Sequence, residues 1–120
     1  MSADLSKVSI SKLEALVVEA GEVLLAADEE GGIGPEEARW DELIHGATRE
    51  LLRRGSEGET VVSRFLEHSN PEVVLTAASV ALAAKFDILQ ARSALQKMCA
   101  SRAGSGWPAH YAQKVLARYP

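Results

Sequence analysis

The chain has 120 residues, of which 47% are hydrophobic, 25% charged and 5% aromatic, with a net charge of −4. This length fits one domain but not two independent ones, and the shortage of aromatic residues favours packed helices over a β-sandwich. A single cysteine, Cys99, excludes an internal disulfide, and the longest apolar stretch, residues 73–84, is too short for a membrane span, which needs about 20 residues. We therefore expect one all-α domain over residues 1–120, soluble and cytoplasmic, without a leader peptide.

The first part of the chain predicts two long helices. Apolar residues at helical spacing indicate a helix over about residues 9–28, with Ser11 and Glu14 as a capping-box pair near its start. The next helix begins at Pro35, because proline suits the first helical turn, where its missing N–H has no partner to lose. A glycine, Gly55, marks the end of this second helix.

Two further helices follow, and the second of them is expected at the centre of the fold. Ser56 with Glu59 forms another capping-box pair and predicts a short helix from Ser56. Asn70 and Pro71 supply an N-cap and a first-turn proline for the next helix. Because residues 73–84 are apolar on nearly all sides, we expect neighbouring helices to cover this one.

The last two helices complete three pairs. Asp87 with Gln90 predicts the start of a fifth helix, and Pro108 opens a sixth. Helix-opening prolines thus recur at Pro35, Pro71 and Pro108, which are 36 and 37 residues apart, a period typical of stacked helical hairpins. We predict a short right-handed α-solenoid, an α-α superhelix of about three helical hairpins with six helices.

The segment 68–78, which contains Asn70-Pro71 and a pair of alanines, resembles the turn and second helix of a HEAT-type repeat. More broadly, residues 38–119 are similar to a small, uncharacterised bacterial family of HEAT-like domains. The features that match are the segments Leu51-Leu52-Arg53-Arg54-Gly55, Phe65-Leu66-Glu67-His68 and Asn70-Pro71, together with the Gly-rich loop before the last helix. The resemblance implies a HEAT-like fold and no specific activity, and a shared fold alone assigns no function.

The HEAT likeness also implies where a partner would bind, because the second helix of each pair then lines the inner face. The residues placed there by this resemblance are Glu72, Thr76, Ser79, Lys114 and Arg118. One position departs from the pattern, since HEAT repeats usually carry an arginine shortly after the valine of the turn, where this chain has Leu75 and Thr76. Any bond that such an arginine makes across repeats or to a ligand is missing here.

Charge is divided unevenly along the chain. Residues 1–60 hold fourteen Asp and Glu against six Lys and Arg, and residues 61–120 hold three against seven. A surface of one sign speeds encounter with a partner of the opposite sign, so the acidic half could bind a basic partner. The acidic residues assigned to this surface are Glu36, Glu37, Asp41 and Glu42. The alternative is two solvated faces whose charges have no role in binding.

No residue pattern indicates catalysis or a metal site. His45, His68 and His110 lie 23 and 42 residues apart, without a second ligand at helical spacing. The serines lack the strand–turn–helix context of a nucleophile, and the basic residues of the second half are scattered singly, which argues against nucleic-acid binding. We expect no enzyme activity, no cofactor, no metal, and neither nucleic acid nor a membrane as partner.

The sequence is interpreted as a non-catalytic protein–protein interaction module, acting as a monomer or a weak homo-oligomer. A rigid stack of helices pre-organises a surface and so limits the entropy lost on association. Two alternatives stay open. One is a bacterial immunity or inhibitor protein that binds a basic toxin through the acidic N-terminal half. The other is an enzyme subunit with a cryptic site, which a pocket holding a desolvated carboxylate would favour.

Overall fold

The computed structural model describes residues 4–29, 34–100 and 107–119, and the regular elements within these ranges are all α-helices. Their bounds are α1 (Ile10–Glu29), α2 (Pro35–Arg53), α3 (Ser56–Phe65), α4 (Pro71–Ala83), α5 (Ile88–Ala100) and α6 (Trp107–Arg118). Each helix begins within one residue of its predicted start. The prediction of an all-α domain with six helices is therefore confirmed for the described part of the chain, whereas the Gly-rich loop before the last helix lies outside it.

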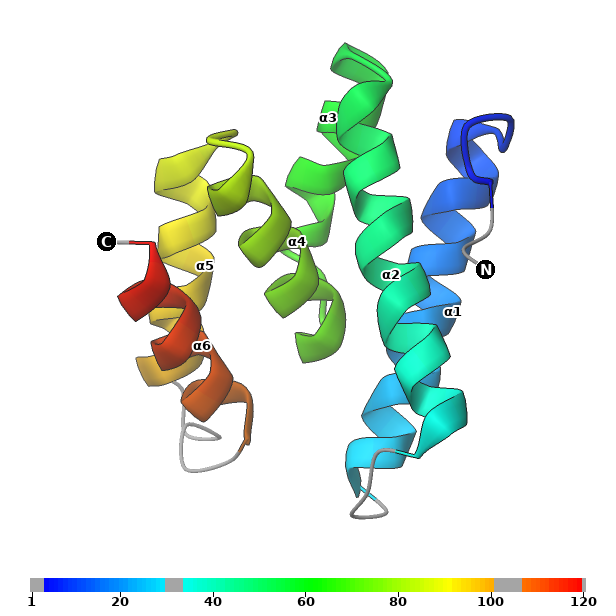
Figure 1. The fold of residues 1–120 in the computed structure, drawn as a ribbon. Helices are drawn as coiled ribbons and strands as arrows, with labels where there is room; N and C mark the ends of the chain where they lie inside the picture. The colour runs from blue at the N-terminus through cyan, green and yellow to red at the C-terminus, as the bar shows by residue number, and fades with distance from the viewer. Residues whose placement is uncertain (1–3, 30–33, 101–106, 120) are drawn as a thin grey trace.

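Consecutive helices run in opposite directions (Figure 1). The α1–α2 pair lies on one side of the molecule and the α5–α6 pair on the other, with α4 between them. Helix α4 contacts each of the other five helices. It is therefore the element that joins the two outer pairs into one body.

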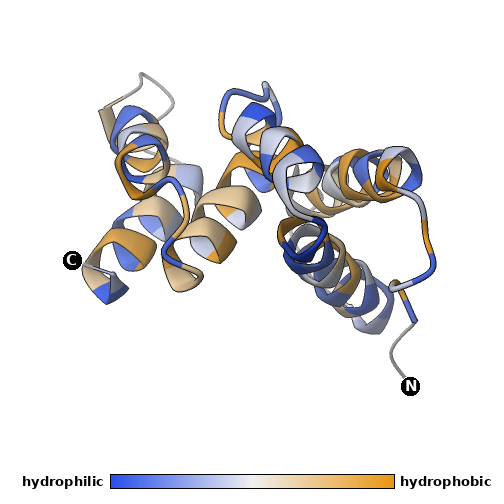
Figure 2. Cartoon of the chain, turned by 90° about the horizontal axis from the view of Figure 1, so that it is seen from above, coloured by the Kyte–Doolittle hydropathy of each residue, from blue (hydrophilic) through white to orange (hydrophobic). Residues whose placement is uncertain are grey.

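The sequence of α4 explains this central position. Nine of its 13 residues are buried, and seen from above it carries little hydrophilic colour compared with α1 and α2 (Figure 2). At its start, Oδ1 of Asn70 accepts a hydrogen bond from the amide of Glu72 at 2.9 Å, and Pro71 occupies the first turn. The prediction of a central, covered helix with this cap is confirmed.

Two glycines let helices approach more closely than a larger residue would allow. At Gly58 in α3, a Cβ atom would collide with the carbonyl oxygen of Leu51 in α2. At Gly21 in α1, a Cβ atom would lie 2.6 Å from Cγ2 of Val73 in α4. The absence of a side chain at these two positions thus sets how closely α3 packs on α2 and α1 on α4.

Arg54, at the end of α2, holds the segment that precedes α1. Its Nη2 donates to the carbonyl oxygens of Leu5 (2.9 Å) and Ser6 (3.0 Å), while its Nε donates to Oε2 of Glu50 (2.8 Å). Within the segment, the hydroxyl and the amide of Ser6 both donate to Asp4, and these hydrogen bonds lower the pKa of that exposed carboxyl. The end of α2 thereby anchors the start of the chain.

The caps of α1 and α3 differ from the predicted ones. Oγ of Ser9, not of Ser11, accepts a hydrogen bond from the amide of Lys12 (3.2 Å) at the start of α1. In α3 the N-cap is Gly55, and Ser56 is already the first helical residue. An N-cap residue must have non-helical dihedral angles, so serines inside the helices cannot serve. The observed caps, Ser9 and Gly55, therefore lie two residues and one residue before the expected ones.

The end of α4 forms a Schellman motif. The amide of Phe86 donates to the carbonyl oxygen of Ala81 (2.8 Å), and the amide of Lys85 donates to that of Leu82 (3.2 Å), the two bonds that define this motif. Lys85 has a φ of 58°, in the left-handed region where glycine is usual. The motif turns the chain sharply enough for α5 to pack back on α4.

Asp87, just before α5, ties this turn to α3. Its Oδ2 accepts a hydrogen bond from Oγ of Ser63 at 3.0 Å, and its φ of 50° is also left-handed. The predicted capping pair of Asp87 with Gln90 is therefore wrong, because the carboxylate is directed to Ser63. Asp87 therefore makes a contact with α3, distant in the sequence, and not the expected local contact with Gln90.

The helices pack into a compact body. Its radius of gyration is 13.6 Å and its principal extents are 40 × 33 × 22 Å, close to the roughly 13–14 Å radius expected for a compact chain of this length. The structure thus establishes a compact all-α domain. The right-handed solenoid is a finer statement that stays a prediction.

Gly58→Ala and Gly46→Ala should change stability in opposite directions. The first puts a Cβ into the backbone of α2 and should cost about 3 kcal/mol. The second adds a Cβ that meets only Cδ1 of Leu5, at an ordinary 3.6 Å, and should add up to about 1 kcal/mol through helix propensity. Urea unfolding followed by circular dichroism measures both. Equal changes in the free energy of unfolding for the two substitutions would show that the close α2–α3 contact does not cause the loss of stability in Gly58→Ala.

Lys85→Gly should raise the free energy of unfolding by about 0.5–1 kcal/mol, because glycine adopts the left-handed conformation without the strain of a side chain. Asp87→Gly is the matched control. It relieves a similar conformation but removes the hydrogen bond to Ser63, which contributes about 1 kcal/mol, so no gain is expected. Thermal unfolding of both variants checks this, and a Lys85→Gly protein no more stable than the parent would contradict it.

Candidate functional site

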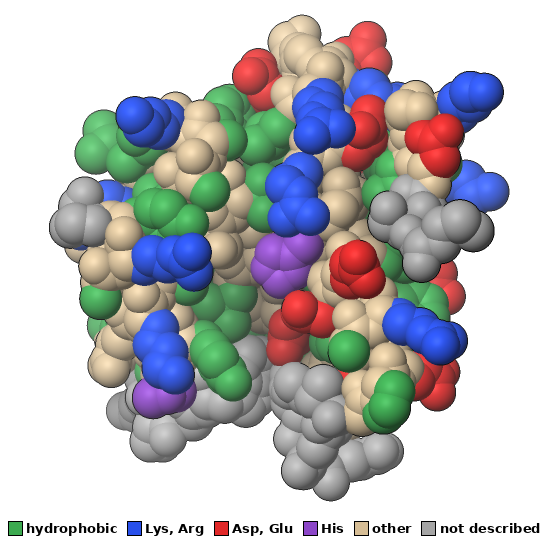
Figure 3. Space-filling model, viewed as in Figure 1, with side chains coloured by type: hydrophobic (Ala, Val, Ile, Leu, Met, Phe, Trp, Pro, Cys, Tyr) green, Lys and Arg blue, Asp and Glu red, His purple; other side chains and the backbone are tan. Residues whose placement is uncertain are grey.

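A groove of about 530 Å³ lies between α2 and the end of α6, with α4 as its floor. In the space-filling view, Lys and Arg side chains stand on both sides of the hollow between the outer helix pairs (Figure 3). We call this site the α2–α6 groove. The described residues that line it are His45, Arg49, Leu52, Arg53, Ser79, Val80, Ala83, Ala84 and Tyr119.

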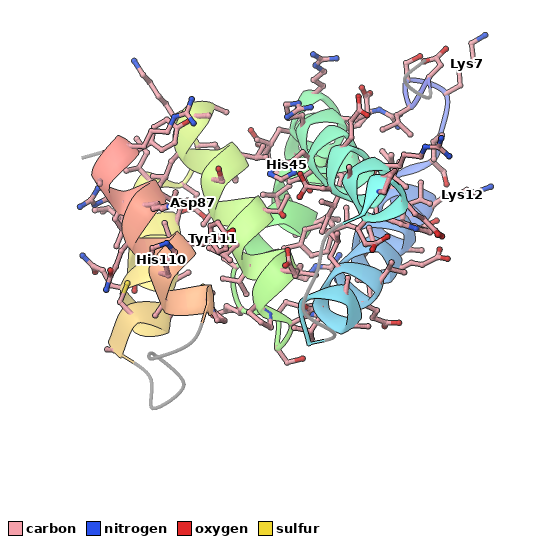
Figure 4. The ribbon with its side chains drawn as sticks, turned by 60° about the horizontal axis from the view of Figure 1, so that its bottom comes forward. Lys7, Lys12, His45, Asp87, His110 and Tyr111 are labelled. Carbon is pink, nitrogen blue, oxygen red and sulfur yellow. The ribbon has the colours of Figure 1, made fainter. Side chains whose placement is uncertain are left out.

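Helix α2 builds one wall with a row of basic side chains. His45, Arg49 and Arg53 are spaced four residues apart, so they share one face of the helix at intervals of about 6 Å. The opposite face buries Ile44 and Leu51 in the core. His45 extends from α2 into the space beside α4 (Figure 4). The apolar face of α2 thereby fixes the direction in which the basic row points.

The two arginines of this row are available to an outside anion. Arg49 is exposed, and its side chain makes no hydrogen bond or ion pair with any described residue. The side chain of Arg53 is 76% exposed, and its Nη1 lies 3.7 Å from Oε1 of Glu50, too far for a hydrogen bond. The Glu50 carboxylate is held more closely by Nε of Arg54, at 2.8 Å. His45 donates from Nδ1 to the carbonyl oxygen of Asp41 at 2.9 Å, which fixes its tautomer. The wall presents positive charge held in place by α2.

The floor of the groove is apolar and made of small side chains. Val80 is buried, Ser79 is half-buried, and Ala83 and Ala84 are exposed at the end of α4. Leu52 of α2 adds a half-buried apolar side chain at the edge. Because residues 79, 83 and 84 carry so little volume, their side chains do not fill the space between α2 and Tyr119.

Tyr119, directly after α6, forms the opposite wall. Nη1 of Arg92 in α5 donates to its carbonyl oxygen at 2.6 Å, which anchors this end of the chain. The guanidinium of Arg118 lies 5.8 Å from the centroid of the Tyr119 ring, within the range of a cation–π contact. Each wall of the groove thus carries or borders a positive charge.

The residues placed on an inner face by the HEAT likeness are only partly brought together. Ser79 lines the groove, whereas Arg118 lies outside the lining, beside the Tyr119 ring. Lys114 is exposed one turn earlier on α6, and Glu72 is half-buried at the start of α4. Thr76 is 3% exposed, so it lies below the surface, where a docked partner would not touch it.

The predicted acidic surface lies on the first half of α2. Glu36, Asp41 and Glu42 are exposed, whereas Glu37 accepts a hydrogen bond from the amide of Gly34 (3.2 Å) and so helps to start the helix. None of these residues lines the α2–α6 groove. Helix α2 is therefore acidic in its first half and basic in its second, the arrangement that its dipole favours.

Sequence reasoning missed the basic row. Its signal was present, because His45, Arg49 and Arg53 follow one another at the spacing of a single helix face. In the sequence, Arg53 belongs to the segment that resembles the HEAT-like family, and His45 was considered only as a metal ligand, for which it has no second ligand at helical spacing. No signal in the sequence places Tyr119 opposite α2, since that proximity depends on how both helices pack on α4.

A second groove, of about 450 Å³, lies between the end of α3, the start of α4 and α5. One of its residues, His68, accepts a hydrogen bond from the amide of Asn70 through Nδ1 at 3.0 Å, so it supports the turn before α4. The groove mixes single acidic and basic side chains without a row of either sign. Its lining is Leu66, Glu67, His68, Val74, Gln90, Ser93, Ala94, Lys97 and Met98.

Metal-binding clusters, membrane-spanning helices and similarity to known proteins give no indication of function. Within the described ranges, no group of three or more His, Cys, Asp or Glu side chains is placed to hold a metal ion. No helix in that part of the chain is both long and apolar enough to cross a membrane. Comparison with protein-family models, with curated proteins and with solved structures finds no match. Function must therefore be inferred from the chemistry of the grooves.

Arg92→Ala should loosen the Tyr119 wall. Losing a charge-assisted hydrogen bond costs about 1.5–3 kcal/mol, so we expect lower stability and faster hydrogen exchange at the amides of residues 115–119. Lys97→Ala, which removes an exposed basic side chain from the same helix, is the control. Hydrogen exchange read by mass spectrometry measures the effect, and equal exchange in the two variants would contradict the anchoring role of Arg92.

Proposed function

We propose that this chain is a non-catalytic protein–protein interaction module that receives its partner in the α2–α6 groove. The observation that carries the proposal is the combination of an apolar floor with an exposed basic wall. Apolar side chains of a partner would gain free energy by leaving water on that floor. The arginines would then select the partner's charge and orientation.

The solenoid arrangement belongs to this proposal. We take α1–α2, α3–α4 and α5–α6 as three pairs of a short right-handed HEAT-like stack, whose second helices α2, α4 and α6 face one side. Two observations support it: the outer pairs are joined through α4, and the groove is lined by α2 and the end of α4, from the second helices of the first two pairs, together with Tyr119, which follows α6. A stack of this kind presents a pre-formed concave surface.

An enzyme with a cryptic site is less well supported. Asp41, His45 and Ser79 invite comparison with a catalytic triad, but Nδ1 of His45 donates to the backbone of Asp41, and the Asp41 carboxylate lies 3.7 Å away. That distance exceeds a hydrogen bond. No hydrogen bond joins Ser79 to His45 among the described residues, and a nucleophile needs one to its base.

Binding of a basic toxin by the acidic half is the second candidate. Its support is that Glu36, Asp41 and Glu42 are exposed on one helix. None of these carboxylates lines the α2–α6 groove or the second groove, and exposed ion pairs alone contribute little affinity. Charge reversal of the three residues would abolish binding if this candidate were correct, and would leave groove binding intact.

Ala83→Trp tests the groove as the docking site. Ala83 is exposed on the groove floor, so an indole there should fill the hollow without disturbing the core. Ala15→Trp places the same side chain on an exposed position of α1 outside both grooves. With each protein as bait in extracts of the producing cell, proteins retained by the parent should be retained by the Ala15→Trp variant and lost by at least about tenfold with Ala83→Trp. Equal retention by both variants would contradict groove binding.

A further inference from the structure

We infer that the partner segment is an amphipathic α-helix with a row of acidic residues beside its apolar face. This inference rests on the proposed function, since it names what the α2–α6 groove receives. It follows from two features of the groove: the hydrogen bonding of its walls and the spacing of its positive charges.

The walls favour a helix over an extended peptide. Leu52 and Arg53 of α2 and Val80 of α4 belong to helices, whose backbone N–H and C=O groups are mostly paired within the helix. An extended peptide on the apolar floor would bury its own N–H and C=O groups without partners, which costs free energy for each group. A helix brings those groups already paired and offers only side chains, as in other helix-in-groove complexes.

The spacing of the basic row determines where acidic residues must lie on the partner helix. Arg49 and Arg53 are about 6 Å apart along α2, one four-residue step of a helix. A partner helix alongside α2 meets them with Asp or Glu at two positions four residues apart. Arg118, which lies beside the Tyr119 ring and outside the lining residues, offers a third positive charge on the opposite side. Apolar side chains between these acids face Leu52 and Val80.

A second copy of the chain is a poorer occupant. Its exposed acids Glu36, Asp41 and Glu42 would complement the basic row in charge. However, the apolar residues of α2, such as Ile44 and Leu51, are buried in its own core, so this helix has no apolar face left to place on the floor. A homo-oligomer is therefore the outcome that the test must exclude.

The test uses the intact chain as bait for a displayed peptide library. Each peptide has about 18 residues, with leucine fixed at helical spacing and flanking positions randomised among Glu, Lys, Ser and Ala. The expected result is enrichment of Glu at two flanking positions four residues apart. Enrichment of Lys, or of no charge, would overturn the inference. Sedimentation of the chain alone at two salt concentrations should show a monomer, and a dimer that blocks peptide binding would also overturn it.

Charge exchange on the protein provides the matched variants. Arg49→Glu with Arg53→Glu should weaken the selected acidic peptides by at least about tenfold. The same variant should bind peptides in which Lys replaces Glu, which also shows that it is folded. Lys7→Glu with Lys12→Glu changes the net charge equally on the far side, beside α1 (Figure 4), and should leave affinity within about twofold. Equal losses in the two variants would mean that net charge, not the row, is recognised.

A proline in the middle of a selected peptide tests the helix. Proline disrupts a helix interior, so affinity should fall by at least about tenfold, and unchanged affinity would overturn the helical part of the inference. The Ala83→Trp variant distinguishes a failure of groove docking from a failure of the inference about which segment docks. If selected peptides bind Ala83→Trp as well as the parent, groove docking itself fails. If they lose affinity there but show no acidic row or tolerate proline, only the inference about the occupant fails.

Discussion

The burial of α4 on nearly every side is the constraint on which the rest of the structure depends. A helix with so few polar residues cannot face water over most of its surface, so both outer helix pairs must pack against it. All five other helices do so. At Gly21 the α1–α4 contact is too close for a side chain. The positions of the outer pairs are thus set by what α4 needs to bury.

The groove follows from where that burial stops. At the last turn of α4 the side chains become small and exposed, with Ala83 and Ala84 at the surface, so α2 and the end of α6 no longer close over it. The same helix that organises the core therefore leaves an apolar floor between two walls. The basic row points into this space because the opposite face of α2 is committed to the core. The burial of α4 thus accounts both for the arrangement of the helices and for the position of the α2–α6 groove.

Much of the fold could be predicted because short sequence patterns specify where its helices begin and which of them is buried. Asn70 and Pro71 specify a helix start by their own chemistry, and the apolar run behind them specifies a buried helix. The groove was harder to predict, because it depends on residues that are distant in the sequence but close together in the fold. Nothing local indicates that Asp87 bonds to Ser63 instead of capping its own helix, or that Tyr119 faces α2. Such contacts arise only once helices have packed.

The central claim is that a protein segment occupies the floor of the α2–α6 groove, and photo-crosslinking in the producing cell tests it most directly. A photoreactive amino acid at position 83 sits on that floor, and one at position 15 sits on an exposed face of α1 outside both grooves. A discrete crosslinked protein is expected from position 83 and none from position 15. The same adduct from both positions, or adducts from position 15 alone, would contradict it.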